Sequence, residues 1–168
     1  MRKPVTPLIK GLITGGVMLA VSLAFYFSGT YATNSSIVYL MYALYAGGII
    51  WTLLDFTKWN PARFTFGQLF NQGFRCFIVV TLIMVVYTAV IFNLHPEWAD
   101  EAAKLYREGL ATEEGKHRTP EEINNTVEQA KKGFVVSNIA VAIFGYLITG
   151  ALITAVAAGF ILTLRRNK

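Results

Sequence analysis

The charged stretch after residue 94 contains the main grouping of side chains that could bind a metal. His95, Glu97, Asp100 and Glu101 follow one another closely, and His117 could join them if the chain folds back. Zinc sites combine histidine, cysteine and carboxylate ligands at characteristic spacings, and catalytic ones usually use more than one histidine. This spacing matches no closed zinc pattern. We therefore predict neither a metal nor another cofactor.

Catalytic signatures are also missing from the sequence. It contains no GxSxG, HExxH, Walker or GxGxxG motif, and Cys76 is its only cysteine, which excludes an intramolecular disulfide and a cysteine cluster. We predict a protein that is not an enzyme. A lipid-modifying enzyme that depends on His95 or His117 remains the third of three hypotheses.

Ionisable side chains in apolar segments would indicate ion-coupled transport, because charge at the bilayer centre is costly and is kept for function. Lys10, Asp55 and Arg75 all lie near the ends of such segments. We interpret them as interfacial anchors whose long side chains reach the headgroups, with Asp55 paired to Lys58 or Arg63.

Composition indicates which elements must position these groups. The chain has 168 residues, 54% of them hydrophobic and only 15% charged, which is typical of an integral membrane protein. A hydrocarbon core of about 30 Å needs roughly 20 helical residues. Four segments meet this length, at residues 8–29, 37–54, 74–94 and 134–164. We therefore predict an all-α integral membrane protein, a single domain over 1–168 with the lipid bilayer as its solvent.

The first segment could be read as a signal peptide, since "TYA" at residues 30–32 ends in a small residue. Its apolar run is longer than a signal h-region, and glycines and aromatics interrupt it, so we favour an uncleaved helix.

Basic residues predict the orientation of the spans. In a four-span arrangement one side receives Asp55 as its single acid together with Arg2, Lys3, Lys10, Lys58, Arg63, Arg75, Arg165, Arg166 and Lys168. Basic residues near span ends are retained in the cytoplasm, so we place both termini there. The formal net charge of +5 is then explained by anionic headgroups, and we predict no nucleic-acid partner.

Residues 95–133 predict an extracytoplasmic helical hairpin between the third and fourth spans. Pro96 suits a helix start, and "TPEE" places Thr119 and Glu122 as a capping box. Apolar residues recur at helical spacing along both halves, and the second stripe continues into the fourth span. The stripes face each other or the bilayer surface, and they contain the candidate partner-binding residues Trp98, Leu105, Tyr106, Ile123 and Val127.

"FTFGQLFNQGFRCF", residues 64–77, combines regularly spaced phenylalanines with amides and an arginine. It predicts either an amphipathic segment in the cytoplasmic interface before the third span or an ordinary aromatic belt.

Small residues four apart indicate where helices approach closely. The candidate helix-packing residues are Gly11, Gly15, Ala151, Ala155 and Gly159. In lipid such positions allow close backbone contact. We favour packing within one chain over a dimer interface.

These features resemble a family of four-helix bacterial membrane proteins classed as domain of unknown function four-one-nine-nine. The resemblance rests on "KGLITGG" in the first helix, "FTFGQLFNQGFR" entering the third, "HPEW" opening the extramembrane segment, and "YLITGALITA" before a basic tail. It covers nearly the whole chain. It implies a protein of the bacterial cytoplasmic (inner) membrane with four helices and no established activity.

Two functional hypotheses follow. The favoured one is a non-enzymatic accessory or scaffold subunit that binds a membrane-protein partner through the outer hairpin. The reason is that the chain combines an ordered, charged outer hairpin with membrane spans that have no ionisable residue in their interior. The alternative is a small transporter or channel that works as a homo-oligomer, with a pathway lined by Tyr39, Tyr42, Tyr45, Thr81, Thr88, Asn138 or Thr149. Such polar residues can equally hydrogen-bond between helices.

Overall fold

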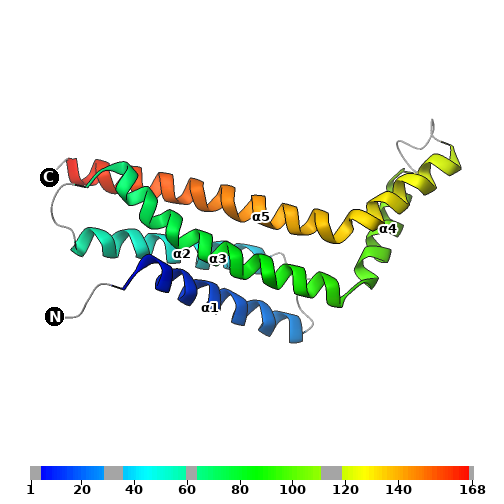
Figure 1. The fold of residues 1–168 in the computed structure, drawn as a ribbon, viewed down its shortest axis with the longest axis horizontal. Coiled ribbons are helices and arrows are strands. Elements are labelled where there is room, and N and C mark those ends of the chain that lie inside the picture. Colours follow the sequence, from blue (N-terminus) through cyan, green and yellow to red (C-terminus); the bar gives the residue numbers. More distant parts are fainter. Residues whose placement is uncertain (1–4, 29–35, 60–63, 111–118, 167–168) are drawn as a thin grey trace. The chain divides into compact units, whose positions relative to one another are not determined.

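The computed structural model describes residues 5–28, 36–59, 64–110 and 119–166, and their regular structure is entirely helical. The elements are α1 (Pro7–Phe27), α2 (Ser36–Trp59), α3 (Phe66–Leu94), α4 (Glu97–Gly109) and α5 (Pro120–Arg166) (Figure 1). They form two compact units: Met1–Met84 with Ile143–Lys168, and Val85–Ala142. The "TYA" sequence and the predicted roles of Arg2, Lys3, Arg63, His117 and Lys168 lie outside the described residues.

Four helices are long and apolar enough to cross a membrane: Pro7–Phe27, Ile37–Trp59, Phe66–Leu94 and Pro120–Arg165. The 21 residues of α1 extend about 32 Å at 1.5 Å per residue, close to the thickness of a hydrocarbon core. The predicted all-helical fold with four apolar helices is confirmed, and the chain is a multi-pass membrane protein. The predicted hairpin arrangement of residues 95–133 remains a prediction.

The α5 helix begins at the predicted capping box. The backbone N–H of Thr119 donates to Glu122 Oε2 at 2.8 Å, and the N–H of Glu122 donates to Thr119 Oγ1 at 3.3 Å. These reciprocal bonds satisfy donors that have no partner within the helix. The helix then continues without a break for 47 residues to Arg166, as the continuous apolar stripe predicts.

A second capping box sets the start of α3. The N–H of Thr65 donates to Gln68 Oε1 at 3.0 Å, and the N–H of Gln68 donates to Thr65 Oγ1 at 3.3 Å. The helix therefore begins at Phe66, eight residues before the predicted span, and the aromatic segment forms its first turns. Phe66 and Phe70 stack along this helix with ring centroids 6.0 Å apart.

Two predicted packing glycines lie against α3. A methyl group at Gly11 would lie 2.6 Å from the carbonyl oxygen of Cys76, and one at Gly15 would lie 2.6 Å from Ile83 Cδ1. Glycine at these positions lets the α1 backbone approach α3 closely. Gly159 differs, because nothing in the described structure lies within 4 Å of the position of its missing methyl group.

Three glycines that the sequence analysis did not select also accommodate side chains from other helices. A Cβ at Gly48 of α2 would meet Thr14 of α1, one at Gly73 of α3 would meet Thr154 of α5, and one at Gly150 of α5 would meet Tyr45 and Phe77. Ala151 and Ala155 are half-buried. Core packing in this unit thus depends on glycines that face bulky or hydroxyl-bearing side chains.

The outer surface of α5 is apolar in its C-terminal half. Large exposed side chains recur there at every fourth residue: Phe144, Ile148, Leu152, Val156, Phe160 and Leu164. This surface suits contact with lipid acyl chains, which solvate apolar side chains but not backbone polar groups.

Candidate functional site

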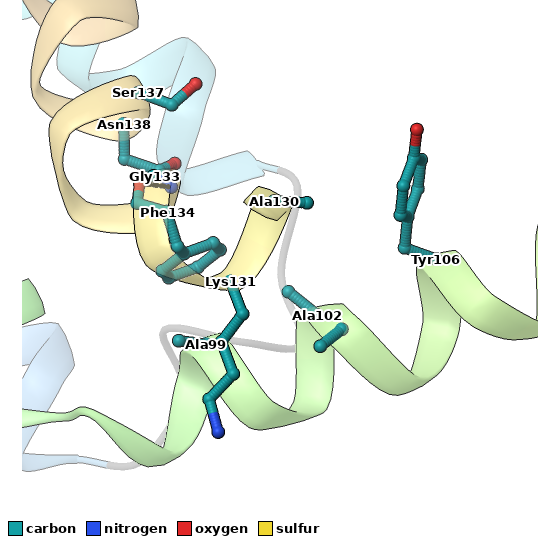
Figure 2. A pocket seen from close by; sticks show the side chains of 10 residues that line it. Ala99, Ala102, Tyr106, Ala130, Lys131, Gly133, Phe134, Ser137 and Asn138 are labelled. Atoms are coloured by element: carbon teal, nitrogen blue, oxygen red, sulfur yellow. Dashed lines mark hydrogen bonds between the residues drawn. The ribbon is translucent and has the colours of Figure 1, made fainter. Parts of the chain in front are cut away.

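The first candidate surface is on α4 and the beginning of α5, within the unit Val85–Ala142. Figure 2 shows Ala102 and Tyr106 on the α4 side of a groove and Ala130 and Phe134 on the α5 side. The groove has a volume of about 350 Å³. An ion pair between Asp100 of α4 and Lys131 of α5 connects the two segments, although both side chains are about half exposed. Alanines at the contact allow the two helices to approach each other.

The five predicted partner-binding residues have different environments. Tyr106 lines the groove, Val127 is buried, and Ile123 is half-buried. Trp98 stacks on His95 at 4.5 Å between ring centroids and is half-buried. Leu105 is 69% exposed. Their proposed role in partner binding is untested and remains a prediction.

The face of α4 that lines the groove differs slightly from the predicted stripe. It consists of Ala99, Ala102, Ala103 and Tyr106, at i, i+3, i+4 and i+7. Each step along a helix rotates by about 100°, so Leu105 does not share this face. The predicted stripe of Trp98, Ala102, Leu105 and Tyr106 shares Ala102 and Tyr106 with this face.

The predicted ligand grouping is divided between two interactions. His95 Nδ1 and Glu97 Oε1 lie 2.5 Å apart, while Asp100 pairs with Lys131. The hydrogen bond from His95 lowers the pKa of Glu97, and a backbone hydrogen bond lowers it further. Among the described residues no three histidine, cysteine or acidic side chains lie close enough to hold a metal ion.

The second candidate site is an ion pair between α1 and α2. Lys10 Nζ donates to Asp55 Oδ2, and the ammonium lies 5.5 Å from the centre of the Trp51 ring. The prediction that Asp55 pairs with Lys58 or Arg63 is wrong with respect to Lys58, which is exposed on the same helix. Packing of α1 against α2 brings Lys10 to the carboxylate instead.

Burial distinguishes Lys10 from an interfacial anchor. Only 2% of this residue is exposed, so its side chain does not extend to the surface as predicted. Beside the pair is a cavity of about 190 Å³. Its lining includes Thr6 and Lys10 of α1, Thr52, Asp55 and Trp59 of α2, and Gln72 of α3. Sequence reasoning missed this site because its residues are far apart in the chain.

Several residues of the predicted transport pathway instead make local or interhelical bonds. Tyr45 Oη donates to the carbonyl oxygen of Tyr146 at 3.0 Å and lies 3.4 Å from Thr81 Oγ1, which connects α2, α3 and α5. Asn138 Nδ2 donates to the carbonyl oxygen of Phe134 one turn earlier. Tyr39 is 76% exposed. Hydrogen bonding between helices therefore accounts for Tyr45 and Thr81.

Comparison with known protein families gives a match over most of the chain. A family model described as "Protein of unknown function (DUF4199)" matches residues 10–163. No curated protein and no solved structure matches the chain significantly.

Proposed function

Because this chain belongs to DUF4199, a family of proteins of unknown function, and is a multi-pass membrane protein, we propose a role that rests on its surfaces. The protein is a non-enzymatic accessory or scaffold subunit, and it binds another membrane protein through α4 and the beginning of α5. The sequence supports this assignment, because it contains no catalytic signature.

The observation that carries the proposal is the exposed apolar surface of α4. Leu105 is 69% exposed and the adjacent Tyr106 is 46% exposed, on a helix whose other exposed residues include Glu101, Lys104 and Arg107. Exposed apolar side chains among charged ones are typical of protein-binding surfaces. Aromatic residues at such centres often supply much of the binding energy.

The proposed location is the bacterial cytoplasmic membrane, with both termini in the cytoplasm and α4 on the opposite side. Charge placement supports this orientation. Lys58, Arg75 and Arg165 belong to the group of basic residues assigned to one side of the four spans. Basic residues near span ends favour the cytoplasmic side.

The experiment is photo-crosslinking in intact membranes from a reactive residue at position 105, followed by mass spectrometry. A matched control carries the same residue at Gln129, an exposed position on α5. We expect one recurrent partner protein at position 105 and none at position 129.

In co-purification from membranes without the cross-linker, a Leu105→Glu variant should recover this partner about tenfold less well than the wild type, since loss of an apolar contact at the centre of an interface costs about 1.4 kcal/mol or more. Links confined to copies of the chain itself would contradict a separate partner. Equal partner recovery from both positions would remove the assignment to α4.

A further inference from the structure

The Lys10–Asp55 pair has hydrogen-bonding capacity that its surroundings leave unused. An ammonium has three N–H donors, and Asp55 is the one oxygen partner of Lys10 among the described residues. The carboxylate of Asp55 can accept several hydrogen bonds, and within the described residues it has no partner besides Lys10. Both members of the pair can therefore bind a further polar group.

Stability alone is a weak reason for such a pair. Removing two charges from water is costly, and their mutual attraction often fails to repay the cost. Intramembrane charges are rare and usually mark a functional site. The 2% exposure of Lys10 therefore calls for a ligand that completes its hydrogen bonding.

The cavity beside the pair has groups of both polarities. The Gln72 amide has no partner among the described residues and, like Lys10, can donate a hydrogen bond. Asp55 can accept a hydrogen bond from a cation, and Trp59 adds an aromatic ring to the lining. This lining complements a molecule that has an oxyanion and an ammonium a few atoms apart.

The depth of the cavity indicates where such a molecule comes from. Lys10 is three residues into α1, about 5 Å from its first residue, and Asp55 is four residues, about 6 Å, before the end of α2. Since α1 matches the thickness of a hydrocarbon core, its first turn lies at the boundary between that core and the lipid headgroups. Val5 and Trp59, which also line the cavity, are 42% and 49% exposed, so the cavity borders the lipid-accessible surface.

We propose that this cavity binds the headgroup of a zwitterionic phospholipid with a primary ammonium. The phosphate accepts hydrogen bonds from Lys10 and Gln72, and the ammonium donates to Asp55. A choline headgroup has no N–H donor to offer the Asp55 carboxylate, and a glycerol headgroup lacks the positive charge. This assignment is independent of partner binding through α4.

The test is native mass spectrometry of the full chain, after exchange with mixed vesicles of phosphatidylethanolamine, phosphatidylcholine and phosphatidylglycerol in equal amounts. We expect retention of phosphatidylethanolamine about tenfold above the other two lipids, as for loss of one charge-assisted contact. The double variant Lys10→Met/Asp55→Asn should lose this preference. Removing both charges leaves no unpaired buried ion, so this variant is expected to fold.

Two further variants make the result specific. Gln72→Leu removes the amide and retains the ion pair, and should reduce the preference several-fold. Asp100→Asn/Lys131→Met removes the exposed pair of the other unit and should leave the preference unchanged.

Equal retention of the three lipids would overturn the proposal. An undiminished preference in both Lys10→Met/Asp55→Asn and Gln72→Leu would also overturn it, because the lipid would then bind elsewhere. Binding of free phosphoethanolamine without any retention of phosphatidylethanolamine would overturn the assignment to a membrane lipid.

Discussion

Replacing Gly150 by alanine should destabilise the protein, whereas the same change at Gly159 on the same helix should not. A methyl group at position 150 would contact Tyr45 Oη and lie 2.7 Å from Cγ of the Phe77 ring. Both neighbours are almost completely buried, at 0% and 2% exposure, so neither can move without disturbing the core. Nothing in the described structure lies within 4 Å of a methyl group at position 159.

The magnitude follows from two opposing effects. Overpacking a core costs about 1–3 kcal/mol, and loss of the hydrogen bond from Tyr45 to Tyr146 adds about 1 kcal/mol. Alanine recovers about 1 kcal/mol relative to glycine in a helix interior. We therefore expect Gly150→Ala to reduce the free energy of unfolding by about 1–3 kcal/mol. Gly159→Ala should raise it by up to about 1 kcal/mol.

The assay uses the single, buried Cys76 as a reporter of unfolding. A thiol-reactive dye in detergent would label it at a lower temperature in Gly150→Ala than in the wild type, and at an equal or higher temperature in Gly159→Ala. A larger loss in Gly159→Ala would refute the reasoning. It would mean that Gly159 packs against another helix, as the spacing of small residues in the sequence predicts.

Two further predictions concern the ends of α4 and α5. Thr119→Ala removes the side-chain cap of α5 and should reduce the local stability of its first turn by about 1 kcal/mol. Hydrogen exchange should show this as faster exchange of the amides in that turn. Unchanged protection of these amides would mean that the cap does not stabilise the helix. The hydrogen bond from His95 lowers the pKa of Glu97, so its stabilising effect is present above the unfolded pKa and is lost as the pH falls through the lower folded value. We expect the fluorescence of Trp98, which stacks on His95, to change with pH in the acid range when the other tryptophans are replaced by phenylalanine. Glu97→Gln should abolish this change. The same fluorescence titration with and without Glu97→Gln would contradict the assignment.

Local signals in the sequence predicted helix ends well where they were applied. The reciprocal spacing of Thr119 and Glu122 identified the start of α5, because a capping box lies within one helical turn. Thr65 and Gln68 have the equivalent spacing, with glutamine in place of glutamate. The phenylalanines that follow favour an interfacial segment, so the sequence predicted a span from residue 74 without predicting where its helix begins.

Contacts between distant residues were not predictable from such local patterns. Asp55 was assigned Lys58 or Arg63, both close in the sequence, whereas its partner Lys10 is 45 residues away. Gly11 was identified from small-residue spacing, but Gly48 was not, because its role depends on which α1 side chain faces it. One sequence specifies the apolar faces of its helices, but not the rotation of each helix against its neighbour.

The glycines that face hydroxyl-bearing side chains constrain how this sequence can change over generations. Gly48 receives Thr14, and Gly73 receives Thr154, so each pair has room for one side chain between two helices. Substitution of the glycine alone creates a clash, while shortening of the threonine first leaves a space that a later methyl group can fill. The two members of a pair should therefore change together in evolution, with the threonine replaced before the glycine.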